Sequence, residues 1–360
     1  MADSTGTPSE AEQAQLDFLP TSGSDVPNIS DHAVDENGSS AGVNGSTAPA
    51  SVDSDVVSEE ELDPPKPKRR KPAANGSSGY VYDESKVKTL SSLEHIRLRT
   101  GMYIGRLGDG ADPEDGIYIL LKEVVDNSID EFMMGNGNRV DVDVEGDLVS
   151  IRDYGSGIPF GKLVECVSVI NTGAKYNDEI YQFSVGLNGV GTKAVNALSS
   201  HFRVTAYRSG RFAGATFERG NLLDEHTGEA PDEPDGTHVE FRPDTEIFGE
   251  YAYLPEFIER RMWSYACLNS GIRLIFNKKR FLSKNGLMDY LMHEVGDAAL
   301  YDPAYHKGQY LEFAFTHTSN YGETFFSFVN GQHTADGGTH QSAFREGILK
   351  GVNEFFKKNY

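Results

Sequence analysis

Hydrophobic residues recur along the chain at two spacings, one typical of helices and one typical of strands. The helical spacing predicts helices over residues 86–99, 116–134, 163–171, 192–200, 254–268 and 341–356. Strict alternation of apolar and polar residues predicts strands over 139–145, 148–152, 202–208, 211–219, 237–243, 272–276, 310–318 and 324–330. Because helices and antiparallel hairpins are mixed rather than strictly alternating, we expect an α+β fold, a two-layer sandwich, and not a doubly wound parallel sheet.

Residues 1–79 do not share this patterning, and we expect them to be disordered. Residues 1–65 contain 14 acidic side chains and no Lys or Arg. Such a segment buries too little apolar surface to offset the entropy lost on ordering it. A basic cluster follows at 66–71. It is either a contact for DNA or an acidic partner or, in the interpretation we favour, a solvated linker that balances the acidic tail.

Charge and cysteine content exclude several classes of protein. The net charge of the 360 residues is −22, and −13 remains for residues 72–360 once the 14 acids of the tail and the five basic residues of the cluster are set aside. That balance does not fit a protein that grips DNA with its whole surface, so any DNA contact is local or belongs to other segments or subunits. Cys166 and Cys267 show neither a disulfide framework nor a metal-binding spacing, which favours a reducing cytoplasm. With no secretory signal and no apolar stretch of about 18 residues, we expect no membrane contact.

The first group of candidate site residues lies on the predicted helix 116–134. At 100° per residue, Glu123, Asn127 and Asp130 fall within about 60° of one another on one face. An amide oxygen one turn from a carboxylate suits a Mg²⁺ on triphosphate oxygens, and the glutamate can polarise an attacking water. The alternative is an ordinary solvated helix face, which this spacing taken alone favours.

Three further groups suit a base and its phosphates. Asp153 at a strand end can accept a hydrogen bond from the exocyclic amine of adenine, and Gly155 and Gly157 let the base approach the backbone. The glycine-bearing run 186–193 precedes a helix, where exposed N–H groups bind phosphate oxygens, and 177–191 is long enough to form a lid. Thr237, before a strand, can support the adenine contact through water. A turn or a flexible loop would explain each group alone, and the run matches neither the P-loop nor the Rossmann spacing.

The order and spacing of these groups are more specific than any one of them. Glu-x3-Asn on a helix, then Asp-x-Gly-x-Gly, Gly-x2-Gly-x-Gly and Gly-Thr resemble the four motifs of the GHKL ATPases, which share the Bergerat fold. The stretches LEHIRLRTGMYIG at 93–105, EVVDNSIDE at 123–131 and GGTH at 337–340, with 171–176 and 185–199, narrow this resemblance. They are similar to the ATPase subunits of bacterial type IIA DNA topoisomerases, the B subunits of gyrase and, more closely, of topoisomerase IV. The resemblance covers 80–360 almost continuously and does not extend to 1–79.

The resemblance implies a role for each matching residue. Glu123 matches the general base that activates water, and Asn127 matches the Mg²⁺ ligand. Asp153 matches the carboxylate that reads adenine, and Thr237 is its companion. Tyr82 matches a tyrosine on an N-terminal arm that enters the nucleotide site of a partner protomer. Arg208 matches an arginine at the mouth of the pocket. The other nucleotide contacts implied in this way are Asp130, Glu131, Gly155, Gly157, Ile158, Pro159, Lys175, Tyr181, Gly186, Leu187, Asn188, Gly189, Val190 and Gly191.

The chain departs from the family pattern at four positions. Thr100 stands where Pro is usual, Ala174 where Gly is usual, and Asn188 where many gyrases have His. At Ser156 the usual residue is an Arg that stacks beside adenine and pairs with the helix glutamate, here Glu131. We therefore expect an empty place beside the base and a Glu131 that is unpaired.

These features predict a GHKL ATPase domain with an N-terminal dimerisation arm over 80–297 and, at 298–360, the start of a ribosomal-S5-domain-2-like transducer domain. We expect a cytoplasmic clamp subunit that uses ATP and Mg²⁺ to close two copies of the chain on double-stranded DNA, together with an A-type subunit that cleaves DNA. The resemblance implies a truncation within the transducer, since Gln-Thr-Lys is absent. Two alternatives stay open. One is another GHKL ATPase, of mismatch-repair or chaperone type, against which GMYIG and GGTH argue. The other is a non-catalytic nucleotide-binding fragment, which only turnover measurements would separate.

Overall fold

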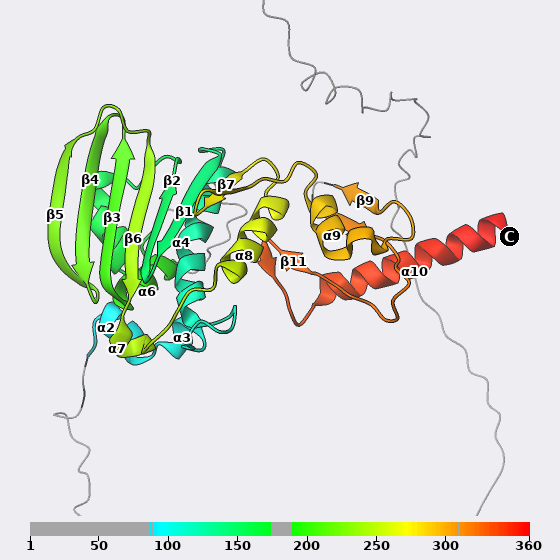
Figure 1. Cartoon of the computed structure of the whole chain (residues 1–360), viewed down its shortest axis with the longest axis horizontal. Coiled ribbons are helices and arrows are strands. Elements are labelled where there is room, and N and C mark those ends of the chain that lie inside the picture. Colours follow the sequence, from blue (N-terminus) through cyan, green and yellow to red (C-terminus); the bar gives the residue numbers. More distant parts are fainter. Residues whose placement is uncertain (1–86, 88, 174–188, 309) are drawn as a thin grey trace, which may run out of the picture. The chain divides into compact units, whose positions relative to one another are not determined.

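A computed structural model describes residues 87, 89–173, 189–308 and 310–360 (Figure 1). The predicted disordered tail and its basic cluster lie outside the described residues. The same is true of the predicted arm residue Tyr82 and of most of the predicted lid.

The described residues form an eight-stranded sheet with the order β5-β4-β3-β6-β2-β1-β7-β8 (Figure 1). Neighbouring strands are antiparallel, except that β1 and β7 are parallel, with Arg139 opposite Arg273. The strands are β1 (Arg139–Glu145), β2 (Leu148–Asp153), β3 (Ser199–Arg208), β4 (Arg211–Glu218), β5 (Asn221–Glu229), β6 (Gly236–Pro243), β7 (Arg273–Phe276) and β8 (Lys279–Phe281).

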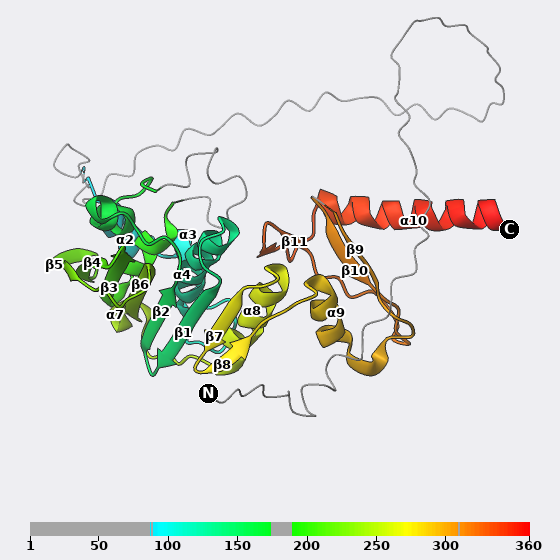
Figure 2. The ribbon, with the colours of Figure 1, turned by 90° about the horizontal axis from the view of Figure 1, so that it is seen from above.

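Helices cover one face of this sheet, and the other face is polar. Alternate strand residues such as Val142, Ile151 and Phe241 are buried, together with the apolar sides of the helices, in one core. The covering helices are α4 (Gly116–Met133), α5 (Leu163–Ser168), α6 (Gly191–Ala197) and α8 (Pro255–Leu268), and Figure 2 shows α4 and α8 from above. The intervening strand residues, including Arg152 and His238, carry the polar groups of the uncovered face. The expected α+β two-layer sandwich is confirmed.

Short helices close the end of the sandwich around one buried carboxylate. They are α2 (Ser92–Leu98), α3 (Gly101–Ile104) and α7 (Thr245–Phe248). Elsewhere, the short 3-10 helix η2 (Phe160–Lys162) precedes α5. Asp244, fully buried at the start of α7, binds Arg97 of α2 at 2.7 Å and Arg219 at 2.9 Å. These two charge-assisted bonds hold the pKa of Asp244 below its usual range despite burial, and they fasten α2 to the sheet.

The C-terminal segment contains two small hairpins and three helical pieces. They are α9 (Leu287–Val295), η4 (Gly296–Ala298), β9 (Ala304–Lys307) paired with β10 (Glu312–Phe315), β11 (Phe328–Val329) paired with β12 (Gln332–His333), and α10 (Thr339–Asn359). Gln332 reaches the sandwich, where its Nε2 lies 3.3 Å from Oδ2 of the buried Asp126 on α4. Lys122 and the hydroxyl of Tyr265 on α8 bind the same carboxylate, so it links three elements.

The bounds predicted from the sequence were most accurate for elements that bury one face. Strand β1 and helix α4 lie where they were predicted, to within one residue. The predicted helix 86–99 forms only as α2, and the predicted strands 310–318 and 324–330 shrink to β10 and β11. Strand β5 was missed because it buries no side chain, and so it carries no alternation to detect. Within the described residues, no helix is both long and apolar enough to cross a membrane.

Candidate active site

Helix α4 carries the carboxylate and the amide that the sequence placed on one face. Asn127 donates from Nδ2 to the backbone carbonyl of Glu123 at 2.9 Å and to Oγ1 of Thr192 at 2.8 Å. Thr192 is the second residue of α6, so this bond fastens the start of α6 to α4. Thr192 belongs to the predicted glycine-bearing run 186–193, but no role of its own was predicted, although a hydroxyl directly after the glycines at a helix start was the available signal.

Gly191 brings the start of α6 against the Glu123 carboxylate. A Cβ at this position would overlap Oε2 of Glu123, so only glycine fits without displacing that side chain. The first N–H groups of a helix point outward and carry partial positive charge. A carboxylate, an amide and a helix start are therefore combined at one place, an arrangement suited to phosphate oxygens and an attacking water.

Asp153 forms a second cluster, near the other end of α4. It ends β2, is 7% exposed, and accepts hydrogen bonds on Oδ1 from the backbone N–H groups of Gly155 and Thr237, both at 3.0 Å. Burial raises its pKa to about 6, because the two amides and the nearby Arg152 only partly offset desolvation, and the charge of Glu131 raises it further. Both amides use the same oxygen, so Oδ2 is the acceptor that Asp153 can offer to a ligand.

Glu131 holds the turn that follows Asp153. Its Oε2 accepts from the backbone N–H and from the hydroxyl of Ser156, both at 2.8 Å. Gly155 packs so closely on this side chain that a Cβ would lie 2.7 Å from Oε2. The expectation that Glu131 is unpaired was therefore wrong: a serine side chain is too short to stack beside a base, but it is long enough to bind the helix glutamate at the turn.

The uncovered face of the sheet supports Asp153 from behind. Arg152 donates to the backbone carbonyl of Asp153 and, from Nη2, to that of Pro234 at 2.6 Å. Its guanidinium lies 4.9 Å from the ring centre of Tyr154 and 4.6 Å from that of Tyr207. Sequence reasoning missed this role of Arg152, because the contacts join residues that only the sheet brings together.

Other predicted residues gather around the Asp153 turn. Gly157 is buried with φ +72°, and its carbonyl accepts from Arg208 at 3.3 Å. Ile158 packs against the core, whereas Pro159 is exposed just before η2. Glu123 and Glu131 lie eight residues apart on one helix, about 12 Å along its axis, which suits the two ends of one extended ligand.

The predicted phosphate run is described only in part. Gly189 has φ +58°, and Val190 precedes α6 directly. Besides Tyr82, five predicted contacts lie outside the described residues: Lys175, Tyr181, Gly186, Leu187 and Asn188. Lys193, buried in α6, donates to the backbone carbonyl of Thr172 at 2.7 Å, which ties α6 to the residues just before that segment. Asp130, also predicted as a contact, is buried in α4.

The residues around Asn127 fit a magnesium ion that is bound mainly by phosphate and water. Two hydrogen bonds from Nδ2 fix the orientation of the amide, and its oxygen is the type of ligand that Mg²⁺ prefers. No group of three or more His, Cys, Asp or Glu side chains that could hold a metal occurs among the described residues.

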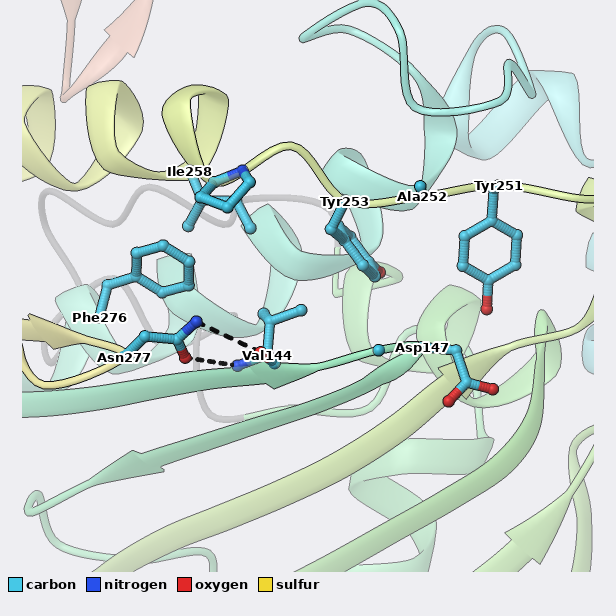
Figure 3. Close-up of a pocket in the computed structure, with 10 residues that line it drawn as sticks. Val144, Asp147, Tyr251, Ala252, Tyr253, Ile258, Phe276 and Asn277 are labelled. Atoms are coloured by element: carbon cyan, nitrogen blue, oxygen red, sulfur yellow. Dashed lines mark hydrogen bonds between the residues drawn. The ribbon is translucent and has the colours of Figure 1, made fainter.

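A separate cavity of about 380 Å³ lies at the opposite end of β2 (Figure 3). Figure 3 shows Tyr251 and Tyr253 projecting from one segment above Val144 and Asp147, with Phe276 and Asn277 at one side. Asn277 closes that side by bonding both the N–H and the carbonyl of Val144, at 2.9 and 3.2 Å. The site residues gather around Asp153 and Glu123, so this cavity is not part of the site.

The combination of α4, α6 and the Asp153 turn on a helix-covered sheet defines the GHKL class of ATPase folds. Residues 112–247 match the family described as "Histidine kinase-, DNA gyrase B-, and HSP90-like ATPase", and residues 286–360 match "DNA gyrase B". The 43K ATPase domain of Thermus thermophilus gyrase B, solved in complex with an aminocoumarin, superposes with a TM-score of 0.60 at 31% identity. The match covers 75% of this chain and 74% of that one.

Two relatives identify the family within the GHKL class to which the chain belongs. The B subunit of DNA topoisomerase 4 from Borreliella burgdorferi is 61% identical over 280 residues, which are 78% of this chain and 47% of that protein. The B subunit of DNA gyrase from Streptococcus pyogenes serotype M1 is 34% identical over 302 residues, which are 77% of this chain and 46% of that protein. The chain belongs to the family of gyrase B and topoisomerase IV B proteins, and it spans about half the length of these two relatives.

Proposed function

We propose that this chain binds and hydrolyses ATP as the clamp subunit of a type IIA DNA topoisomerase. The observation that carries the proposal is the Asp153 carboxylate. It is buried at the end of β2 and held by two amides, and the turn that follows it is bound by Glu131 of α4. The same helix places Glu123 and Asn127 against the start of α6. One helix thus spans a site for a base and a site for phosphates, and the gyrase B family membership supports reading the two as one nucleotide site.

Each side chain has a defined task in this proposal. Asp153 accepts from the adenine amine through Oδ2, with Thr237 beside it. Asn127 would hold Mg²⁺, which would supply positive charge to the phosphate oxygens. Glu123 orients the attacking water and takes its proton, while the N–H groups at Gly189, Val190 and Gly191 face the phosphates. Lys175 and Tyr181 complete the site as lid residues.

The same proposal covers the domains of the chain, its partners and its location. Residues 80–297 form the ATPase domain, and 298–360 begin the transducer domain. ATP closes two copies of the chain around double-stranded DNA, and hydrolysis reopens them. The remaining partner is the A-type subunit that cleaves DNA, and the location is the cytoplasm.

The test of the nucleotide site is equilibrium binding of ATP and GTP to the wild-type chain and to Asp153→Asn. We expect the wild type to prefer ATP. The variant should bind ATP about 10- to 100-fold more weakly, the cost of losing a hydrogen bond to a charged acceptor, and its preference over GTP should narrow because an amide can also donate to the guanine carbonyl. Unchanged affinity and selectivity would reduce Asp153 to a turn residue and remove the proposal's main support.

The same binding experiment has a pH dependence with a definite sign. The pKa of Asp153 is raised to about 6 in the free protein, and the adenine amine donates a stronger hydrogen bond to the ionised carboxylate than to the protonated carboxyl group. ATP affinity should therefore rise as pH increases towards 6, by up to about tenfold per pH unit, and level off above it. The phosphates of ATP also titrate in this pH range, but they affect binding to the wild type and to Asp153→Asn alike. The difference between the two pH profiles therefore reports the Asp153 carboxylate alone. Identical pH profiles would contradict the assignment.

Ser156→Arg should tighten ATP binding by about 0.5–2 kcal/mol, the range for a cation–π contact that is partly desolvated. A guanidinium at this position can replace the serine as the partner of Glu131 and can also lie flat beside the base. Isothermal titration calorimetry measures the gain. Ser156→Lys is the matched control, because it adds the charge without the flat face. An equal gain from both variants would mean that charge alone is responsible.

Tyr82→Ala should impair ATP-dependent dimerisation more than ATP binding, because an aromatic side chain on a short arm suits insertion across a twofold axis. Sedimentation or cross-linking with and without a non-hydrolysable ATP analogue measures the effect. Deletion of residues 1–75 is the control and should leave dimerisation intact. Equal dimerisation of the wild type and Tyr82→Ala would refute the role of the arm.

A further inference from the structure

The side chain of Arg152 connects the two backbone segments that hold Asp153. It leaves β2 on the uncovered face of the sheet, one residue before Asp153. One guanidinium nitrogen binds the carbonyl of Asp153 itself, and the other binds the carbonyl of Pro234 at 2.6 Å. The two carbonyls belong to separate strand ends, so a single planar group bridges them.

The turn that starts at Pro234 supplies one of the two amides bound to Asp153. Gly236 has φ +138°, and a Cβ there would overlap the carbonyl of Asp153 and the guanidinium of Arg152, so the turn is packed without spare room. The N–H of Thr237 follows and lies 3.0 Å from Oδ1 of Asp153. The position of this amide depends on where Arg152 holds Pro234.

Aromatic rings fix the guanidinium in its place. It lies between Tyr154 and Tyr207, 4.9 and 4.6 Å from the ring centres. The hydroxyl of Tyr154 donates to Asp141 at 2.9 Å, and Arg139 lies 5.0 Å from the centre of the same ring. A guanidinium between two rings has little freedom to move. A lysine can reproduce neither the stacking nor the pair of hydrogen bonds to the two carbonyls.

We propose that Arg152 is a positioning residue that determines base specificity: from the uncovered face of the sheet it sets the distance between Asp153 and the Thr237 turn, and thereby the edge at which a purine is read. The proposal rests on the nucleotide site proposed above and extends it to a residue that does not touch the ligand. Specificity for one purine over another depends on the fixed spacing of donors and acceptors at the base edge.

Arg152 also acts on the charge of Asp153. Its positive charge opposes the rise in the pKa of Asp153 caused by burial and by Glu131 on α4. Other described ionisable groups around Arg152 are Tyr154 with its neighbours Arg139 and Asp141, Arg208 on β3, and His238 on β6, which lies opposite Arg152 in the sheet. Burial lowers the pKa of this histidine, on which the charges of Glu240, Arg203 and Glu233 also act. Removing the positive charge of Arg152 should therefore raise the pKa of Asp153, whereas replacing it with lysine should not.

The test compares Arg152→Met and Arg152→Lys in equilibrium binding of ATP and GTP between pH 5 and 8. We expect both variants to bind ATP about 10- to 100-fold more weakly, with a narrower preference over GTP, because neither can bridge the two carbonyls. Only the methionine variant should also move the midpoint of the pH profile upward. Arg203→Met is the matched control: Arg203 projects from β3 and its ion pair with Glu240 is at 3.7 Å, so this change should leave binding unaltered.

Three outcomes would overturn the inference. If both variants bind ATP with the affinity of the wild type and with the same preference over GTP, the bridge from Arg152 to the two carbonyls is dispensable. A lysine variant equal to the wild type would show that charge alone matters. An equal loss in Arg203→Met would point to a general effect on the sheet. If Arg152→Met does not fold, the lysine variant alone decides. Failure of the proposed nucleotide site itself appears separately, as an Asp153→Asn variant that binds ATP like the wild type.

Discussion

Glu123→Gln is expected to leave ATP binding near the wild-type level and to lower turnover by about 10²–10⁴-fold, the contribution of a positioned general base. The glutamine keeps the shape of the side chain and its fit against Gly191, but it cannot accept a proton. The amide of Asn127 is bound to the backbone carbonyl of Glu123, which the substitution keeps, so the proposed metal ligand should stay in place.

The measurement pairs ATP binding with phosphate release under steady-state conditions. Glu165→Gln on α5 is the control, since this exposed glutamate binds Lys162 and lies outside the proposed site. Turnover that is unchanged in Glu123→Gln would remove Glu123 as the base. A wild-type chain that binds ATP without measurable turnover would favour the alternative of a non-catalytic nucleotide-binding fragment.

Gly191→Ala is expected to lower turnover by about 10²-fold, the cost of misplacing a catalytic group by roughly 1 Å. The added methyl group would overlap the Glu123 carboxylate, so the base must move. Alanine is a better helix former than glycine by about 1 kcal/mol, so α6 itself should not be destabilised by the change. The loss should therefore appear in turnover and ATP affinity and not in the melting temperature.

Gly161→Ala is the matched control, because a Cβ there meets nothing within 4 Å. Thermal melts of both variants separate a local effect from unfolding. Normal turnover in Gly191→Ala would mean that α6 can shift freely away from α4. The bond between Asn127 and Thr192 would then not hold the two helices in register.

Much of the fold was predictable because burial imposes a period on the sequence. Strand β1 alternates between buried valines and polar residues, and α4 has a continuous apolar side, so both were found to within one residue. Strand β5 lies at the sheet edge with no buried residue, and its sequence carries no such signal. Strands β10 and β11 of the C-terminal segment were predicted too long, since alternation shows what a strand can bury but not where its pairing ends.

Without the family resemblance, spacing groups the candidate site residues only along single elements. Glu123 and Asn127 share a helix, and Asp153 and Gly155 share a turn, so spacing sufficed to group them. Arg152, Pro234 and Tyr207 meet only because β2, β6 and β3 are neighbours, which no local pattern reveals. Ser156 was interpreted through the residue it replaces, and its own hydrogen bonds to Glu131 were therefore missed.

The parallel pairing of β1 with β7 affects the order in which the chain can fold during synthesis. Strand β1 emerges early, but its outer neighbour begins only at Arg273, after every described residue of the candidate site has been made. Until then β1 is an edge strand with free backbone groups and with valines on one face, the type of edge that pairs with other chains. A shorter polypeptide that stops after β6 would retain Glu123, Asp153 and Thr237 and still present this open edge. The last strands of the sheet carry none of the described site residues, yet by pairing with β1 they close the edge at which another chain could pair.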